Sequence, residues 1–193
     1  MSGAFSIETV DVLVIGAGPA GLAAAASTAS AGLKTLLVDE NSSPGGQIYR
    51  AITRSPFADS GVLGDDYWDG RKLVADFEAS GAILLGETQV WSLDATRRVG
   101  MSHKGRTRFV QAERVIIATG AQERPFPIPG WTLPGAMSVG AAQTLLKASG
   151  LVPDGRVVIA GQPCASASPT TRPKFSECVG STNTSAFQYA SLL

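Results

Sequence analysis

Short apolar runs alternate with stretches of small or amphipathic residues along most of the chain. Residues 10–15 (VDVLVI) form a β-branched apolar run, which is typical of a strand buried on both faces. A Gly-rich turn follows, then the helix-forming segment LAAAASTASAG, which ends at Gly32, and residues 34–38 (KTLLV) form a second apolar run. Strand, helix and strand within about 30 residues predict a βαβ unit with a right-handed crossover.

The period of the pattern changes in the middle of the chain. Residues 65–80 carry apolar side chains at helical spacing and are followed by Gly81, which predicts a helix. The remaining predicted elements are, in chain order, strands at 82–85 and 88–93, a hairpin with arms at 99–102 and 108–111 about Lys104-Gly105, a buried strand at 113–120, a Pro-rich linker at 121–135, a helix at 139–149 and a strand at 156–160.

The composition limits the classes to which the protein can belong. Its 193 residues include 16 basic and 16 acidic side chains, so the formal net charge is zero. A nucleic-acid or acidic-membrane partner would call for a basic surplus, and we expect neither. With 44% apolar residues, disorder is excluded for most of the chain. Two widely spaced Cys, Cys164 and Cys178, form no metal site or redox pair, and so few Cys favour the cytoplasm over a secreted disulfide scaffold.

One uncharged stretch, residues 12–33, has the length of a membrane span. Gly16, Gly18, Pro19 and Gly21 interrupt it, and nearly half of it is Ala and Ser, which contribute little transfer free energy. We therefore expect a turn and a helix of a soluble protein here, and no membrane span.

The turn after the first predicted strand has the sequence Gly16-x-Gly18-x-x-Gly21 and opens directly into a predicted helix. In a dinucleotide-binding fold the first Gly permits the tight turn, the second lets the pyrophosphate approach the backbone, and the third allows helix and strand to pack closely. Backbone N–H groups at the helix N-terminus then bind phosphate oxygens. Because strand, helix and a later acidic residue accompany the glycines, the motif predicts a dinucleotide site rather than an ordinary Gly-rich turn.

The acidic residue is Asp39, which ends the second predicted strand 18 positions after Gly21. Its carboxylate can accept hydrogen bonds from ribose hydroxyls, and Glu40 is the neighbouring candidate. An acid here disfavours NADP, because a 2′-phosphate would be repelled. NAD and FAD share the adenosine diphosphate half, so this motif leaves both open.

Three segments together resemble a known group of flavoproteins: residues 10–40, PGGQIYR at 44–50 and RVIIATGAQERPFPIPGW at 114–131. They are similar to the FAD-dependent, pyridine nucleotide-disulfide-oxidoreductase-like (glutathione-reductase-like) superfamily with two dinucleotide-binding domains. More narrowly, GGQIYRAI and PGWTLPG…GAAQTLLKASG resemble the large (A) subunit of opine oxidases, and the subunits of cyanide-forming glycine oxidase and dye-linked amino-acid dehydrogenase are close relatives. The resemblance covers residues 10–162.

The resemblance implies an α/β fold class: a Rossmann-like FAD/NAD(P)-binding fold with a parallel sheet, a βαβ unit and a small antiparallel β meander. It implies FAD as cofactor, oxidation of the C–N bond of an opine-like amine or amino-acid derivative by hydride transfer to the flavin, and a partner in the form of a second oxidoreductase subunit. The cofactor-binding residues that it implies are Gly16, Ala17, Gly18, Pro19, Ala20 and Gly21 at the pyrophosphate, Asp39 and Glu40 at the ribose, Gly45, Gly46 and Gln47 beside the pyrophosphate and ribityl chain, the backbone of Val90 at the adenine, and Ala118, Thr119 and Gly120 near the flavin. Arg50 is a candidate for a phosphate contact and, equally, for a surface salt bridge.

No catalytic residue and no metal ligand is predicted. The motifs carry no Ser/His/Asp set, paired Cys or HExxH, and in such proteins the chemistry belongs to the isoalloxazine ring. The single His, His103, lies among basic residues of the predicted hairpin, which favours an exposed hairpin over a general base.

The resemblance stops where a second Gly-rich turn is expected. Pro163 stands where the family has a Gly, and Pro lacks the N–H group that a phosphate would use. We expect an FAD-binding domain at 1–125, then a linker, a helix and the first strand of an incomplete second nucleotide-binding domain at 126–162. An atypical tail follows at 163–193, disordered or read in a shifted frame, so that the chain would be truncated and impaired.

Three functions from different classes stay open. The first is an FAD-dependent oxidoreductase subunit, the second an NAD-binding module without flavin, and the third an inactive remnant of a flavoprotein that at most binds a partner protein. The segments Gly45-Gly46-Gln47 and Ala118-Thr119-Gly120 favour FAD over NAD.

Overall fold

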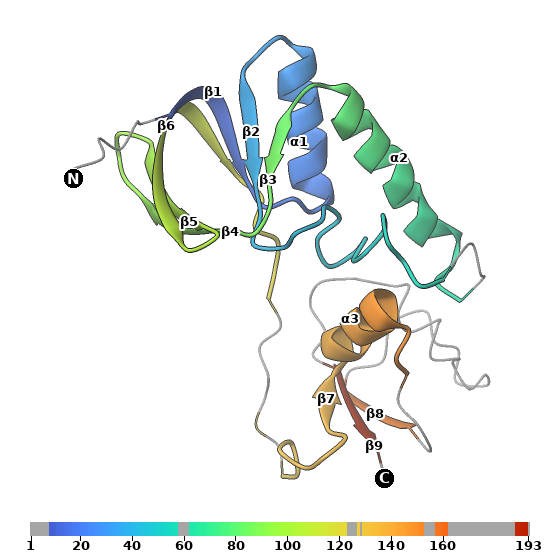
Figure 1. Ribbon diagram of the computed structural model, residues 1–193. Helices are drawn as coiled ribbons and strands as arrows, with labels where there is room; N and C mark the ends of the chain where they lie inside the picture. The colour runs from blue at the N-terminus through green and yellow to red at the C-terminus, as the bar shows by residue number, and fades with distance from the viewer. Residues whose placement is uncertain are drawn as a thin grey trace. The chain divides into compact units, whose positions relative to one another are not determined.

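The computed structural model describes residues 8–57, 62–122, 127 and 129–152, together with the backbone of the strands at 157–161 and 188–192 (Figure 1). The chain divides into two compact units. One comprises Met1–Thr53 and Trp68–Gly120, and the other comprises Arg54–Tyr67 and Ala121–Leu193.

The first unit contains a six-stranded sheet in the order β3-β2-β1-β6-β5-β4. Its strands are β1 (Glu8–Ile15), β2 (Thr35–Val38), β3 (Ile83–Leu85), β4 (Thr88–Leu93), β5 (Arg98–His103) and β6 (Arg106–Ile117). Neighbours among β3, β2, β1 and β6 are parallel, whereas β4, β5 and β6 pair antiparallel. The predicted fold class, a parallel sheet with a βαβ unit and a small antiparallel meander, is confirmed.

Strand β6 belongs to both parts of this sheet. It pairs with β5 from Arg106 to Gln111 and with β1 from Val110 to Ile117. The predicted hairpin about Lys104-Gly105 is confirmed, but its second arm and the strand predicted from residue 113 are one continuous strand, so their predicted separation is wrong. The polar residues Glu113 and Arg114 are exposed, so they do not interrupt the backbone pairing as the strand passes from one neighbour to the other.

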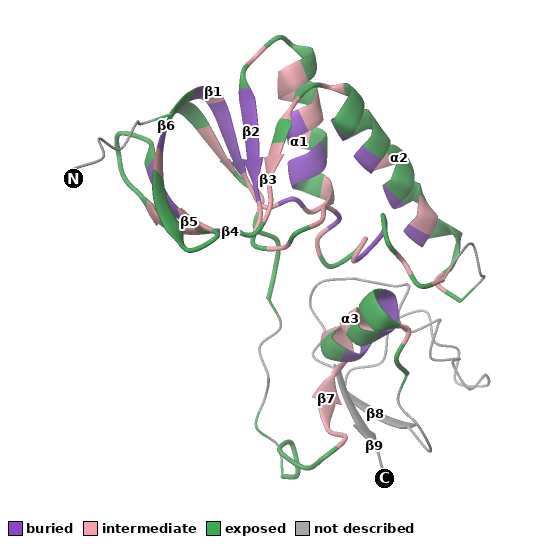
Figure 2. Ribbon diagram, in the orientation of Figure 1, coloured by how far each residue is buried: buried purple, intermediate pink, exposed green. Residues whose placement is uncertain are grey.

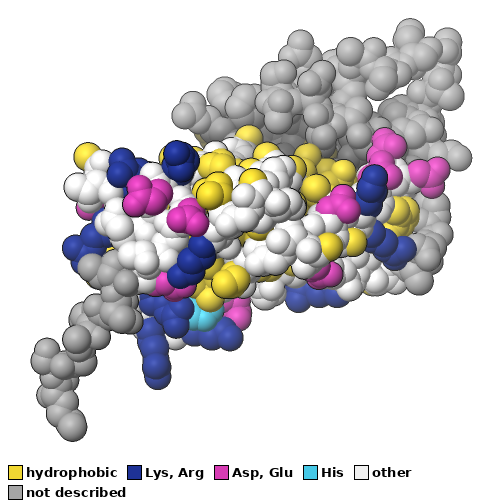
Figure 3. Space-filling model, turned by 90° about the horizontal axis from the view of Figure 1, so that it is seen from above, with side chains coloured by type: hydrophobic (Ala, Val, Ile, Leu, Met, Phe, Trp, Pro, Cys, Tyr) yellow, Lys and Arg dark blue, Asp and Glu magenta, His cyan; other side chains and the backbone are white. Residues whose placement is uncertain are grey.

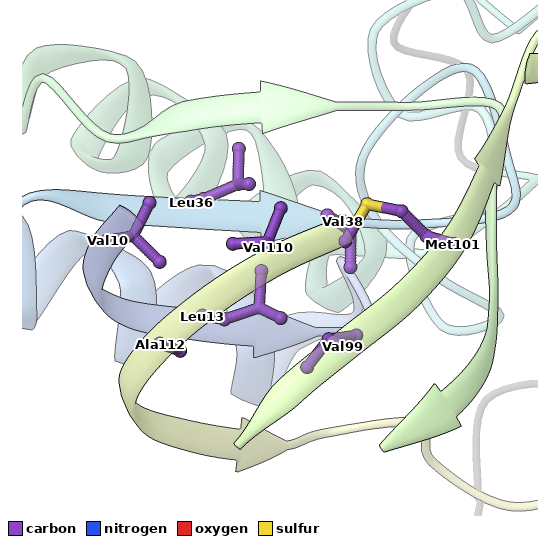
Figure 4. Close-up of a cluster of buried hydrophobic side chains, with 8 residues drawn as sticks. All are labelled: Val10, Leu13, Leu36, Val38, Val99, Met101, Val110 and Ala112. Carbon is purple, nitrogen blue, oxygen red and sulfur yellow. The ribbon is translucent and has the colours of Figure 1, made fainter. Parts of the chain in front are cut away.

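The hydrophobic core of the first unit joins the meander to the parallel strands. Figure 4 shows side chains of β1, β2, β5 and β6 pointing toward one another. The members of this cluster are Val10, Leu13, Leu36, Val38, Val99, Met101, Val110 and Ala112. Side chains alternate between the two faces of a strand, so Leu37, which lies between Leu36 and Val38 in β2, points to the opposite face.

Two helices complete the first unit (Figure 2). Helix α1 (Pro19–Ser30) lies against β1 and β2 and buries Leu22 and Ala25. Its first residue is Pro19, where the missing N–H group costs no intrahelical hydrogen bond. Helix α2 (Asp65–Ala79) belongs to this unit from Trp68 onward, and there it buries Gly70, Val74 and Phe77, which follow one another at helical spacing.

The second unit contains the three-stranded antiparallel sheet β7-β9-β8 and helix α3. These elements are β7 (Met137–Ser138), α3 (Val139–Ser149), β8 (Val157–Gly161) and β9 (Gln188–Leu192). The helix predicted at 139–149 is confirmed, and it begins at Ser138, whose Oγ accepts a hydrogen bond from Ala141 N at 3.2 Å. The predicted strand at 156–160 is found as β8. Most of the tail expected at 163–193 lies outside the described residues, apart from β9.

No helix in the described part of the chain combines the length and the apolar character that crossing a membrane requires.

Candidate functional site

Four parallel strands end at the same edge of the sheet, and the loops that follow them are joined by backbone hydrogen bonds. β1, β2, β3 and β6 lead directly into Gly16, Asp39, Gly86 and Ala118. The joining bonds are Gly16 N to Val38 O at 2.8 Å, Asp39 N to Leu85 O at 3.2 Å and Ala118 N to Ile15 O at 2.8 Å. In open α/β sheets this edge, outside the carboxyl ends of the strands, is where ligands bind.

Two glycines of the first Gly-rich loop are required by packing. Gly16 has φ +105°, and a Cβ there would overlap the carbonyl oxygen of Ala118. A Cβ on Gly21 would overlap the carbonyl oxygen of Gly16. Both overlaps are with backbone, which cannot rotate away as a side chain could, so the loop, α1 and the end of β6 approach one another only because these residues lack a side chain.

Gly18 differs from its neighbours because the space beside it is open. It is the N-cap of α1 with φ −71° and ψ −179°, and a Cβ there would meet no atom within 4 Å. The first intrahelical bond runs from Leu22 N to Gly18 O at 2.9 Å, so the N–H groups of Ala20 and Gly21 have no intrahelical acceptor. The first turn of α1 carries no acidic residue. An anionic group can therefore approach this helix N-terminus, as the pyrophosphate of a dinucleotide would.

The second Gly pair lies directly against the first loop. Gly45 N donates a hydrogen bond to Ala17 O at 2.8 Å, and Gly45 has φ +120°. Gly46 has φ +60°, and a Cβ there would lie 2.8 Å from Gly18 Cα. The two Gly-rich segments thus form one surface beside the N-terminus of α1, while Gln47 is exposed next to them.

Asp39 connects three parts of the site through its carboxylate. Oδ2 accepts a hydrogen bond from Ala17 N at 2.6 Å. Oδ1 accepts two, from Asn41 N at 2.7 Å and from Asn41 Nδ2 at 2.8 Å. Asn41 is not among the site residues predicted from the sequence. The signal that could have found it is that an Asp side chain often accepts a hydrogen bond from the backbone N–H two residues later, as Asp39 does from Asn41. The neighbouring Glu40 is exposed.

Arg50 extends this network. Its Nη1 donates to Asn41 Oδ1 at 2.6 Å and its Nη2 donates to Gln47 Oε1 at 3.2 Å. Arg50 therefore belongs to the site by way of two amide side chains, a role that neither of the two predicted alternatives, phosphate contact or surface salt bridge, included.

The start of β4 is attached to the acidic loop. Thr88 N donates to Asp39 O at 2.8 Å and Glu87 N donates to Asn41 O at 3.1 Å. Val90 follows in the same strand, where it is half-buried and packs against the core cluster. The strand position expected to meet an adenine and the acid expected to meet its ribose are thus held in one hydrogen-bonded assembly.

Of the three residues that follow β6, Ala118, Thr119 and Gly120, Ala118 lies closest to the Gly-rich loop. Ala118 packs against Gly16, and its Cβ would lie 3.4 Å from a Cβ on Gly21. Thr119 and Gly120 are exposed, and Gly120 has φ +71° with open space beside it.

His103 is half-buried rather than simply solvent-exposed, unlike the expectation for its hairpin. Its Nδ1 lies 3.0 Å from Thr88 Oγ1 and 3.2 Å from Gly86 O, so the ring is held at the corner between β3 and β4. In Figure 3 the cyan atoms of this single His reach the surface, with Lys and Arg side chains among their neighbours. The basic residues of the hairpin are exposed as predicted. The described residues contain no group of three His, Cys, Asp or Glu side chains that could hold a metal ion.

Comparison of the sequence with known proteins identifies relatives of the chain. The chain is 48% identical over 159 residues to the A subunit of opine oxidase from Agrobacterium tumefaciens (strain Ach5), which covers 78% of this chain and 32% of the relative. It is 38% identical over 152 residues to the HcnB subunit of hydrogen cyanide synthase from Pseudomonas aeruginosa, which covers 77% of this chain and 32% of the relative. The chain thus spans about a third of the length of these relatives.

Among solved structures, the L-proline dehydrogenase from P. horikoshii superposes with a TM-score of 0.63 at 22% identity, over 78% of this chain and 31% of that one. This likeness concerns the fold. The family model described as pyridine nucleotide-disulphide oxidoreductase matches residues 10–161, which include every loop of the site and the six-stranded sheet except the first two residues of β1. The chain therefore belongs to the pyridine nucleotide-disulphide oxidoreductase family.

Proposed function

We propose that the chain binds FAD through the adenosine diphosphate half of the cofactor, at the edge of the sheet where β1, β2, β3 and β6 end. The observation that carries this proposal is the open space beside Gly18, bordered by the N-terminus of α1 and by the second Gly pair. Every other glycine of the two loops fills a tight backbone contact, so the one unfilled position coincides with the one where a phosphate needs room.

The residues that would hold the cofactor follow from their places in the loops. Gly16, Ala17, Gly18, Pro19, Ala20 and Gly21 would surround the pyrophosphate, with Gly45, Gly46 and Gln47 beside it. Asp39 and Glu40 would lie at the adenosine ribose, the backbone of Val90 at the adenine, and Ala118, Thr119 and Gly120 toward the flavin. The carboxylate of Asp39 and the helix N-terminus supply complementary partners for hydroxyl and phosphate groups.

We further propose that the chain acts as a subunit of a flavin-dependent oxidoreductase. The reaction proposed is oxidation of the C–N bond of an amine or amino-acid derivative of the opine type. Bound FAD would supply a two-electron acceptor for the hydride on the carbon next to nitrogen. The support is the 48% identity to a protein named as the A subunit of an opine oxidase, a name that also indicates at least one other subunit. The same proposal includes a partner subunit for this protein.

Ligand binding tests the first proposal. The flavin-free chain is titrated with FAD, ADP, FMN and NAD by calorimetry, and FAD binding is followed by the visible spectrum. FAD and ADP are expected to bind, and FMN, which lacks the adenosine half, is not. NAD binding as tight as FAD binding would favour the NAD-binding module instead. Absence of binding by both FAD and ADP would contradict the proposal.

The second proposal needs a separate readout. The FAD-loaded chain is mixed anaerobically with an opine and, in parallel, with the parent amino acid. Bleaching of the flavin band by either compound supports C–N oxidation. Retention of the band with every amine tested, in a chain that binds FAD, contradicts the activity and leaves the binding proposal intact.

A further inference from the structure

The carboxylate of Asp39 is already largely occupied by the protein's own donors. A carboxylate offers about four acceptor positions, two on each oxygen. Asn41 fills both positions of Oδ1, through its backbone N–H at 2.7 Å and its side-chain amide at 2.8 Å. Ala17 N fills one position of Oδ2 at 2.6 Å. Among the described residues these are the donors that reach the carboxylate, so one acceptor position remains, on Oδ2.

The orientation of the Asn41 amide follows from its two neighbours. A carboxylate only accepts hydrogen bonds and a guanidinium only donates them. The amide nitrogen must therefore face Asp39 and the amide oxygen must face Arg50, whose Nη1 lies 2.6 Å from it. Reversing the amide would place a donor against Arg50 and an acceptor against Asp39. Arg50, itself attached to Gln47, thus keeps the Asn41 side chain on Oδ1 of Asp39.

We propose that Asn41, positioned by Arg50, limits Asp39 to the recognition of a single ribose hydroxyl. This inference rests on the proposed binding of the adenosine diphosphate half. Recognition of both neighbouring hydroxyls by one carboxylate needs an acceptor position on each oxygen, and Oδ1 has none left. Removing the Asn41 side chain frees one position on Oδ1 and allows the second hydroxyl to be bound. Asn41 is thus a specificity-determining residue of the nucleotide site.

The test compares ADP, 2′-deoxy-ADP and 3′-deoxy-ADP, each titrated calorimetrically into the flavin-free full chain. A hydrogen bond to a charged group corresponds to a factor of about 10 to 100 in affinity. For the unaltered protein, one deoxy analogue is expected to bind about tenfold or more weaker than ADP, and the other within about twofold of it. In Asn41→Ala both analogues are expected to bind weaker than ADP by about tenfold or more.

Two further variants keep the result interpretable. Ser42→Ala removes an exposed side chain at the adjacent position and is expected to retain the single-hydroxyl pattern. Arg50→Met keeps Asn41 but removes the hydrogen bond that holds its side chain on Oδ1 of Asp39. The Asn41 side chain can then turn away from Oδ1, so the second hydroxyl gains a measurable contribution even if Asn41→Ala fails to fold.

Three results bear against the proposal in different ways. Equal weakening of both analogues with the unaltered protein shows that Asp39 binds both hydroxyls, which overturns the inference but not the proposed function. An unchanged single-hydroxyl pattern in folded Asn41→Ala and in Arg50→Met overturns it as well. Failure of the unaltered chain to bind ADP and FAD overturns the proposed function and this inference together.

Discussion

Exchanging Gly18 and Gly21 separately for Ala separates cofactor binding from folding. A Cβ on Gly21 would overlap Gly16 O and lie 2.9 Å from Gly16 C, closer than the 3.0 Å below which real Cβ contacts essentially never occur. The obstacle is backbone at the end of β1, so either α1 or the strand end has to shift. Overpacking of this kind costs about 1–3 kcal/mol, and rigid neighbours place Gly21→Ala at the upper end, about 3 kcal/mol.

Gly18→Ala meets no such obstacle. Its backbone has φ −71° and no atom lies within 4 Å of the new Cβ. Replacing Gly by Ala where the conformation allows it stabilises a protein by about 0.4–1 kcal/mol through the unfolded chain. Ala is a weaker N-cap than Gly, and that loss offsets part of the gain. We therefore expect the free energy of unfolding to change by less than about 1 kcal/mol.

Binding of FAD is expected to respond in the opposite order. The methyl group of Gly18→Ala enters the space that the pyrophosphate would occupy, and an overlap of about 1–3 kcal/mol weakens binding about 5- to 150-fold. Urea unfolding measures the stability of both variants, and titration of the flavin spectrum measures affinity. The reasoning is refuted if Gly18→Ala binds FAD as tightly as the unaltered chain, or if it is destabilised as much as Gly21→Ala.

Three further predictions concern stability and packing. Burial lowers the pKa of Lys147 to about 8, so between pH 8 and pH 10.5 the unfolded chain holds a proton that the folded chain has released. The free energy of unfolding of the full chain is expected to rise with pH across this window, and Lys147→Met removes that rise in urea titrations, whereas an unchanged slope would contradict the assignment. Leu13→Ala, at a fully buried position, is expected to cost about 2–5 kcal/mol by urea unfolding, and the exposed Ile83→Ala less than about 1 kcal/mol; equal losses would contradict the core as described. In Gly100→Ala the new Cβ would lie 2.7 Å from Trp91 Cη2, the outer end of a side chain that is 53% exposed, so the indole swings into water. The emission of Trp91, obtained by subtracting the spectrum of a Trp91→Phe variant, is expected to shift to the red, with little loss of stability. An unshifted emission would show that the ring has not moved.

The local features of the candidate site could be predicted from the sequence because they depend on neighbours in the chain. A β-branched run, three glycines at fixed spacing and a small-residue helix specify β1, the turn and α1, and the structure has them there. The family resemblance, read from three segments, is confirmed by the match over residues 10–161. Helix α3 has the predicted bounds, and in the structure Ser138 is its N-cap and Gly150 its C-cap.

Other features depend on contacts between distant residues and could not be predicted in this way. The continuity of β6 follows from its pairing with β1, which bridges Glu113 and Arg114 although these residues are polar. The hydrogen bonds that fill the Asp39 carboxylate come from Ala17 and Asn41, which lie in different loops. The position of His103 depends on its contacts with Thr88 and Gly86.

By itself, the sequence determined the fold class, the order of the elements around the Gly-rich loop and the positions of the glycines in that loop. These properties follow from φ/ψ preferences and from hydrophobic periodicity, which act over a few residues. Only the tertiary structure decided which glycine faces open space and how many hydrogen bonds Asp39 can still accept. Both are counts of neighbours contributed by different strands and loops, and they exist only once the ends of four strands have been brought to one edge of the sheet.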